Sequence, residues 1–275
     1  MSDIRTQQDL AELFRGLHDG FLVLPNAWDA ASAHLITTIG AKAIATSSGA
    51  QSWSQGVPDG RSLAKADVLA NLERIVAATE LPVSADIENA YADSADGLRA
   101  MVTQFLATGI VGVNLEDSGA SDGPLHDTVA AAERIAAARA AAKDTGVDLF
   151  INARTDVFLL GVGEEDGRLA DVIARGNAYR EAGADGLFIP GLLDLDALGT
   201  VARETGLKIN AMWLPGAPSP EQLREAGVSR YSAGTAIAQV AYTSAVDAAR
   251  AFLAGRDKAM AESIDYFAFN DKFAK

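Results

Sequence analysis

Two carboxylates stand one residue apart where an apolar run ends, at Asp86 and Glu88 in the stretch "PVSADIENAYA" (82–92). If this run is a strand, alternate side chains point to the same side, so both carboxylates face one common space. Like charges that share a space repel each other unless a cation or a shared proton relieves the repulsion. The spacing therefore favours a cation-binding pair, and the alternative is that both side chains lie in a wet loop.

Two further charged side chains follow other apolar runs in the same way, because Glu116 ends "GVNLE" and Arg154 ends "FINAR". Carboxylates without accompanying His or Cys residues form a hard-oxygen site, which suits Mg²⁺ and, as a second choice, Mn²⁺. The planar guanidinium of Arg154 matches a carboxylate or a phosphate, and an ion pair with Glu116 or Asp156 is the alternative. These residue types predict a metal-assisted site for a small oxyacid.

A turn of small residues and one histidine carry weaker signals. The residues of "SSGAQ" (47–51) could let backbone N–H groups approach an anion. His126 lies in the loop "EDSGASDGPLHDT" (116–128) and could reach the site if that loop closes as a lid. The other two histidines, His18 and His34, lie in helical segments and are interpreted as structural.

The elements that must position these residues follow one repeated pattern, in which a helix-ending glycine precedes a short apolar run. Glycine suits the left-handed residue that ends a helix, and short apolar runs suit parallel strands buried on both faces. Eight such strands, each followed by a helix, in about 250 residues predict an α/β fold, the TIM (β/α)8 barrel, with a doubly wound open sheet as the alternative. The strands are expected within 21–29, 39–48, 80–88, 108–117, 145–156, 182–191, 205–213 and 226–234.

A barrel enzyme keeps its site at the carboxyl ends of its strands, and polar residues should gather there. They do so in this sequence, at Asn26, Asp29, Ser47, Ser48, Asp86, Glu88, Asn114, Glu116, Asp117, Asn152, Arg154, Asp156, Asn210 and Ser232. No linker or composition break divides the chain. We therefore expect a single barrel domain over 1–275, with 255–275 as a C-terminal helical tail.

Several kinds of chemistry are excluded. A Schiff-base aldolase needs a lysine in the barrel mouth, but Lys42 and Lys208 open their strands at the far end. "GVG" (161–163) is no dinucleotide-binding motif, because Asp166 stands where a third glycine would be. The absence of cysteine excludes disulfides, thiolate catalysis and cysteine-bound zinc.

The charge and hydropathy of the chain limit its partners. It has 275 residues, of which 49% are hydrophobic and 22% charged, and a net charge of −14. Nucleic acids and anionic membranes attract basic patches, so neither is an expected partner. The first 20 residues lack the apolar stretch of a signal peptide, and no apolar run reaches membrane-spanning length. We expect a soluble, cytoplasmic protein that acts on a small molecule.

Taken in order, these motifs resemble the isocitrate lyase/phosphoenolpyruvate mutase superfamily. "LPNAWDAASAHLITTIGAKAIATSSGA" resembles the opening of that family, and "GVPDG" (56–60) resembles its loop ending in Asp. "SADIENAY" stands where the family has Asp-Ala-Asp, "VNLED" where it has Ile-Glu-Asp, and "NART" where it has Ala-Arg-Thr. The match runs from about residue 20 to residue 240, and it implies the barrel fold already predicted.

The resemblance implies site roles and an assembly. It implies an Mg²⁺ site at Asp86, with Glu88 and Glu116 holding the metal waters, and a homo-oligomer, tetramer or dimer, whose barrels exchange their last helix. The aromatic tail (265–273) suits docking on another subunit, and packing on its own barrel is the alternative. The remaining candidates are Ser48, Gly49, Ala50, Arg154 and Asn210 for the substrate, and Asp59, Glu116, Arg154 and His126 for catalysis.

Departures from the family pattern bear on the exact reaction. The Lys-Xaa-Cys-Gly-His signature of the lyase branch and the Lys-Thr-Asn of the mutase branch are both absent from "DSGASDGPLHD" (117–127). We therefore expect an Mg²⁺-dependent enzyme acting on small 2-oxo or 2-hydroxy (di)carboxylates through an enolate, most simply a carbon–carbon lyase. The alternatives are a phosphonopyruvate-type P–C hydrolase or mutase, an oxaloacetate hydrolase or decarboxylase, and a non-catalytic 2-oxo-acid-binding protein.

Overall fold

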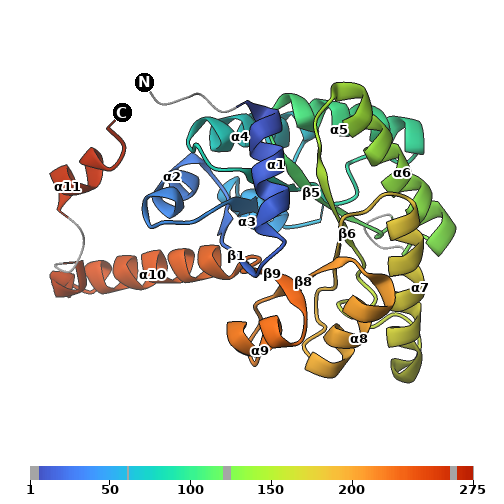
Figure 1. Ribbon diagram of the computed structural model, residues 1–275. Helices are drawn as coiled ribbons and strands as arrows, with labels where there is room; N and C mark the ends of the chain where they lie inside the picture. The colour runs from blue at the N-terminus through green and yellow to red at the C-terminus, as the bar shows by residue number, and fades with distance from the viewer. Residues whose placement is uncertain (1–5, 61, 120–124, 261–264, 275) are drawn as a thin grey trace.

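A ring of parallel strands forms the centre of the computed structural model, which describes residues 6–60, 62–119, 125–260 and 265–274 (Figure 1). The strands are β1 (Leu22–Leu24), β2 (Asn26–Ala27), β3 (Ile44–Thr46), β4 (Val83–Asp86), β5 (Gly112–Glu116), β6 (Phe150–Arg154), β7 (Gly186–Phe188), β8 (Lys208–Met212) and β9 (Val228–Ser232). They are hydrogen-bonded in the order β1-β9-β8-β7-β6-β5-β4-β3-β2. Because β1 and β2 are halves of one strand, separated by Pro25, their bonds to β9 and β3 close the ring.

Helices alternate with the strands along the chain and surround the ring (Figure 1). They are α1 (Gln7–Leu17), α2 (Ala30–Thr38), α3 (Ser48–Ser54), α4 (Lys65–Ala77), α5 (Ala95–Ala107), α6 (Thr128–Thr145), η1 (Glu165–Gly167), α7 (Arg168–Glu181), α8 (Leu195–Thr205), α9 (Pro220–Glu225), α10 (Ala236–Leu253), η2 (Asp257–Met260) and α11 (Tyr266–Asp271). Side-chain caps fix several starts. Asp194, for example, accepts a hydrogen bond from the N–H of Ala197 at 2.8 Å.

The predicted barrel is confirmed, and each run expected to hold a strand contains one. The first strand is split because Pro25 has no N–H to donate, yet its carbonyl still accepts from Ala45 at 3.0 Å. Apolar side chains of the strands, such as Val113 and Ile151, are fully buried in the core that the helices cover. The ring excludes the open doubly wound sheet.

The amino-terminal end of the barrel is stoppered by α1. Phe14 of this helix packs with Leu22 of β1 and Phe150 of β6 in a small apolar cluster inside the ring. His18, at the end of the helix, stacks on Phe150 with ring centroids 4.0 Å apart. This filling leaves the carboxyl-terminal end, here called the mouth, as the open end of the barrel.

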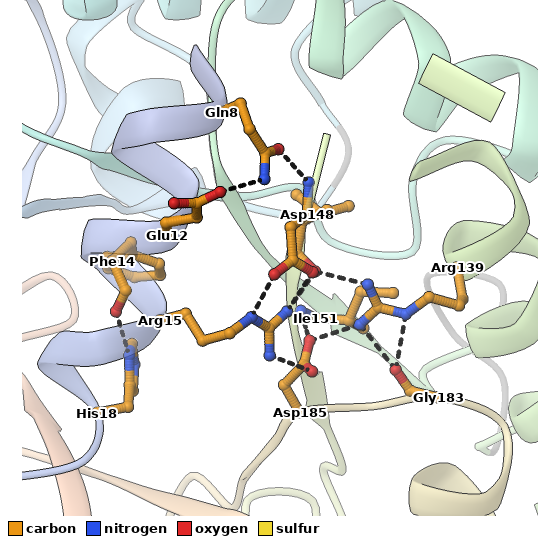
Figure 2. A network of polar contacts seen from close by, with 11 residues as sticks. Gln8, Glu12, Phe14, Arg15, His18, Arg139, Asp148, Ile151, Gly183 and Asp185 are labelled. Atoms are coloured by element: carbon orange, nitrogen blue, oxygen red, sulfur yellow. Dashed lines mark hydrogen bonds and ion pairs between the residues drawn. The ribbon is translucent and has the colours of Figure 1, made fainter. Parts of the chain in front are cut away.

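A polar network ties α1 to the strand starts at this same end (Figure 2). Asp185 accepts from Arg15 at 2.7 Å, from Arg139 at 2.5 Å and from the N–H of Ile151 at 2.8 Å. Arg15 also forms a two-point bond with Asp148, at 2.8 and 2.9 Å. The network lies opposite the mouth, so we interpret it as structural.

The last long helix, α10, leaves the barrel instead of packing on it (Figure 1). Only Ala238 of its residues is buried, whereas Val246 is 54% and Leu253 is 87% exposed. Farther on, Phe273 returns to α2, where its ring lies 5.2 Å from that of His34. None of the helices in the described residues combines the length and apolar character that membrane crossing requires.

Candidate active site at the barrel mouth

The charged side chains predicted for the site meet at the carboxyl ends of β4, β5 and β6. In the parallel register Asp86 pairs with Asn114, and Glu116 pairs with Arg154. The three carboxylates also interact electrostatically. Burial is the largest cause of the raised pKa of Glu88, and the negative charges of Asp86 and Glu116 raise it further. The structure thus brings the three carboxylates together on one side of the mouth.

Asp86 is fixed at the end of β4 by residues that follow β3. Its Oδ2 accepts from Oγ of Ser48 at 2.9 Å and from the backbone N–H of Ser48 at 3.3 Å. Its own N–H donates to Oγ1 of Thr46 at 3.0 Å. Oδ1 is buried and has no hydrogen-bond partner in the part of the chain that the structure describes. A buried carboxylate oxygen without a donor is rare, so this atom is available to a cation.

Glu88 reaches the mouth through a turn and not through the strand, which ends at Asp86. Glu88, Ala90 and Tyr91 have φ values of 51°, 58° and 53°, a left-handed conformation that is uncommon for residues other than glycine. The hydroxyl of Tyr91 donates to Oε1 of Glu88 at 2.6 Å. Burial raises the pKa of Glu88 to about 7. We expected Asp86 and Glu88 to lie on one face of the same strand. This expectation is wrong, because the strand ends at Asp86, although both side chains face the mouth.

Arg154 is held between two carboxylates. Its Nη1 lies 3.0 Å from Oε2 of Glu116, and its Nε and Nη2 donate to the two oxygens of Asp156 at 2.7 and 3.0 Å. Both ion pairs considered as alternatives for this arginine are thus present. Burial raises the pKa of Glu116 to about 7, although the nearby Arg154 acts to lower it. Glu116 also accepts a short hydrogen bond from Oγ of Ser118.

Asp59 and the first turn of α3 lie against each other at the mouth. Ser48, Gly49 and Ala50 are buried there, and a Cβ on Gly49 would lie 2.8 Å from Oδ2 of Asp59. A larger side chain at position 49 would therefore push the Asp59 carboxylate away from its present place. Surrounding protein raises the pKa of Asp59, with a further contribution from the charge of Asp86, even though part of its side chain faces solvent.

His126 lies beside the barrel wall, apart from the carboxylates. Its backbone N–H donates to the carbonyl of Asp117 at 2.8 Å, and its carbonyl accepts from Arg175 at 2.9 Å. Burial lowers the pKa of the His126 imidazole, and the positive charge of Arg134 lowers it further. Part of the preceding loop, 120–124, lies outside the described residues. A catalytic His126 stays a prediction that this arrangement does not support.

Asn210 lies below the mouth, inside the barrel. Its Nδ2 donates to Oγ of Ser232 at 3.1 Å, and its Oδ1 accepts from Asn152 at 3.0 Å. Asn152 also donates to Oδ1 of Asn114 at 2.9 Å. These three asparagines form a layer, here called the amide layer, under the carboxylates. Because both ends of the Asn210 amide are engaged, a direct contact between Asn210 and a substrate stays a prediction.

Two site residues were not predicted from the sequence, Tyr91 and Arg230. Arg230 points into the barrel from β9, where the strand register places it between Leu22 of β1 and Asn210 of β8. An arginine on the inward face of a predicted barrel strand was a usable signal. For Tyr91 no comparable signal existed, because the left-handed turn before it contains no glycine.

The donor atoms fit a divalent ion held mainly by one carboxylate. Within the described residues no group of three His, Cys, Asp or Glu side chains gathers closely enough to ligate a metal together. Glu88 accepts a hydrogen bond from Tyr91, and Glu116 pairs with Arg154. Asp86, Glu88 and Glu116 therefore do not act as three direct metal ligands. A buried unpartnered Oδ1 on Asp86, flanked by two acids, suits Mg²⁺, which retains several waters.

Comparisons with known proteins show the family of the chain. The chain matches the family model described as phosphoenolpyruvate phosphomutase over residues 14–253. An uncharacterised protein of Mycobacterium tuberculosis is 36% identical over 235 residues, which cover 85% of this chain and 86% of that protein. The 2-methylisocitrate lyase of Halalkalibacterium halodurans is 28% identical over 212 residues, covering 75% of this chain and 68% of that enzyme.

Among solved structures, a candidate lyase/mutase of Burkholderia cenocepacia J2315 superposes with a TM-score of 0.91. It is 34% identical, and the match covers 98% of each chain. The family model spans most of the barrel, including every carboxylate of the mouth. The chain belongs to the phosphoenolpyruvate phosphomutase family, within the isocitrate lyase/phosphoenolpyruvate mutase superfamily of lyases and mutases.

Proposed function

We propose that this chain is an Mg²⁺-dependent enzyme that acts on small 2-oxo or 2-hydroxy (di)carboxylates through an enolate, most simply as a carbon–carbon lyase. One observation carries the proposal, the buried and unpartnered Oδ1 of Asp86 between Glu88 and Glu116. Acidic groups crowded in this way are relieved by a cation, and oxygen donors select a hard one. Mn²⁺ would fit the same donors.

The metal would be held by Asp86, with Glu88 and Glu116 accepting hydrogen bonds from its waters. When bound, Mg²⁺ would supply electrostatic stabilisation for the negative charge that develops on an enolate oxygen. Glu88 and Glu116, whose pKa values burial raises to about 7, can be ionised or protonated near neutral pH. Ion binding would therefore favour their ionised forms and release protons.

The other residues of the mouth bind and orient the substrate. Arg154 spends three of its nitrogens on Glu116 and Asp156, yet a guanidinium has five N–H groups, and the rest can donate to a carboxylate. The backbone of Ser48, Gly49 and Ala50 offers a compact surface for the same group. These roles fix the acid end of the substrate next to the metal-binding carboxylate.

A proton must also move at the carbon where the bond breaks, and the chain has no cysteine for that step. Asp59 faces Gly49 at the mouth and is partly exposed to solvent, and the surrounding protein together with the charge of Asp86 raises the pKa of its carboxyl, a group that can accept and donate a proton. We assign the proton transfer to Asp59. His126 would have to lie in a different position to transfer this proton.

The description of the matching family favours a second candidate function, transfer or hydrolysis at a P–C bond of a phosphonopyruvate-like substrate. The same carboxylate-binding end and the same enolate serve both reactions, so the reacting bond decides between them. Oxaloacetate hydrolysis or decarboxylation uses the same groups. A substrate panel scored for released phosphate, pyruvate or oxalate separates these reactions.

The test combines metal binding with turnover. We expect wild-type protein to bind Mn²⁺ in titration calorimetry, and Asp86→Asn to lose at least about 100-fold in affinity, since the side chain that carries the unpartnered Oδ1 loses its negative charge. Asp166→Asn, an exposed carboxylate of η1, is the matched control and should bind like wild type. Unchanged affinity in Asp86→Asn would refute the metal assignment. Binding of 2-oxo acids without turnover across the panel would indicate the non-catalytic alternative.

We also propose that two copies exchange their α10 helices. The outward side chain Val23 of β1 is 55% exposed, at the place beside β9 and β1 that the last helix of a barrel would cover. In the same chain α10 exposes Val246 and Leu253. The uncovered strand face of one chain matches the uncovered apolar helix of a second copy, and the exchange gives a dimer. A tetramer would need a second interface between two such dimers.

A further inference from the structure

Arg230 is a buried cation that ordinary ion pairing does not explain. It is 1% exposed, and its Nη2 donates to Oδ1 of Asn114 at 3.2 Å, across the barrel from β9 to β5. Its Nε and Nη1 are buried and have no hydrogen-bond partner in the described residues. On its other side lies the ring of Phe14, 6.0 Å from Cζ of Arg230. Such a group costs stability, because two N–H groups have lost water without replacement.

Two other arginines with little solvent exposure in the barrel are compensated by carboxylates. Arg154 is paired with Glu116 and Asp156, and Arg175 with Asp117 at 3.1 Å. For Arg230 no described carboxylate lies within ion-pairing distance. A buried unpaired charge that destabilises the fold points to a role in function.

The position of Arg230 defines the groups on which its charge acts. Burial lowers the pKa of Arg230 to about 9, and the negative charge of Asp86 acts in the opposite direction. The guanidinium is therefore charged at neutral pH. It contacts the amide layer through Asn114, whose Oδ1 also accepts from Asn152. The cation thus lies directly beneath the acids of the mouth, in a medium where water screens little.

We propose that Arg230 is a positioning residue that sets the electrostatic potential of the mouth, weakening divalent-ion binding at Asp86 and strengthening the binding of a carboxylate beside that ion. The inference rests on the metal-dependent function proposed above. An unpaired buried cation would thus have a function in ligand binding in a chain whose net charge is −14. An anionic substrate that approaches the mouth meets the carboxylates of Asp59, Asp86, Glu88, Glu116 and Asp156. It needs a counter-charge such as Arg230, because Arg154 is already neutralised by Glu116 and Asp156.

The test is Arg230→Met, which removes the charge and nearly keeps the volume. We expect Mn²⁺ affinity of the apo protein to increase by about two orders of magnitude, the effect of one unit charge on a divalent ion roughly 10 Å away at an effective dielectric constant of about 20. Oxalate binding at saturating Mn²⁺ should weaken by a similar factor. Arg230→Lys, which keeps the charge, should return both affinities toward those of wild type.

A stability measurement separates this role from a structural one. Urea unfolding of apo Arg230→Met should show a midpoint equal to or above that of wild type, because Asn114 keeps its bond from Asn152 and no carboxylate is left unpaired. The matched control Arg175→Met should unfold at lower urea, because it strips the buried Asp117 of its cation. Arg230→Met that unfolds early and loses both ligands, or that changes neither affinity, overturns the inference. Wild-type protein without Mn²⁺ affinity overturns the proposed function first, and this inference with it.

Discussion

Nη1 of Arg154 lies 3.0 Å from Oε2 of Glu116, across the paired ends of β6 and β5. In the proposed function, the side chain that would bind a substrate carboxylate is thus also the partner of an acid beside Asp86. Asp156 holds the other edge of the guanidinium, so Arg154 is oriented without a ligand. This arrangement would couple the proposed substrate binding to the charge state of Glu116.

Replacing Arg154 with methionine should destabilise the fold by about 3–5 kcal/mol, because Glu116 and Asp156 are left buried without their cation. Urea unfolding at pH 7.5 measures the change. Arg224→Met is the control, since Arg224 is exposed and pairs with Glu221 at 3.7 Å, and it should change stability by about 0.5 kcal/mol or less. A loss below about 1 kcal/mol in Arg154→Met would mean that the pair is solvated and not preorganised.

Replacing Tyr91 with phenylalanine should shift metal binding to higher pH. The Tyr91 hydroxyl donates to the Glu88 carboxylate at 2.6 Å and so lowers the pKa of Glu88, which burial has raised to about 7. Without this bond the pKa rises further, by about one unit for a hydrogen bond to a charged group. Mn²⁺ titrations between pH 6 and pH 9 would show the midpoint of binding moving upward. Tyr266→Phe, in the exposed tail, should leave it in place, and an unmoved midpoint in Tyr91→Phe would contradict the coupling.

The strands and the place of the site were predictable because both depend on local sequence. Runs such as "IVGV" (110–113) are apolar on both faces, as buried parallel strands require, and their carboxyl ends must meet at one end of a barrel. Asp86 and Glu116 were therefore placed correctly from their positions at strand ends. The resemblance to known motifs added the family, which the comparisons confirm.

The features that were not predicted depend on distances through space. The guanidinium of Arg230 meets Asn114 across the ring, 116 residues away in the chain, and strand register does not say how far a long side chain reaches. The turn that carries Glu88 has left-handed residues without glycine, so no residue type announces it. The departure of α10 from the barrel was anticipated only through the family resemblance, because the helical pattern of α10 does not say which surface covers it.

Helix exchange predicts that a charge on the apolar side of α10 breaks the assembly. Val246→Asp should convert an oligomer into a species near the chain mass of 28.6 kDa in light scattering, because the buried carboxylate would have no partner. Ser244→Asp, an exposed position two residues from Val246 and so on nearly the opposite side of α10, is the matched control and should keep the oligomer. A wild-type protein that is monomeric at micromolar concentration would contradict the exchange.

His18 predicts how acid affects the fold. Burial lowers its pKa to about 3, with Arg230, Lys208 and Arg15 acting in the same direction, while Nδ1 remains bonded to the Phe14 carbonyl at 2.8 Å. The unfolded chain takes up this proton near pH 6.5 and the native state does not, so this group destabilises the fold as pH falls from about 6.5 toward 3.

The variant His18→Phe removes this titration and keeps an aromatic ring on Phe150. Relative to wild type, its free energy of unfolding should improve by about 1.4 kcal/mol for each pH unit between pH 6 and pH 4. Chemical denaturation at half-unit intervals gives both curves, and the comparison of slopes is independent of any constant packing change. Above pH 7.5 the two curves should run parallel, since His18 is neutral in both states. Curves that stay parallel down to pH 4 would show that native His18 takes up its proton as readily as the unfolded chain does.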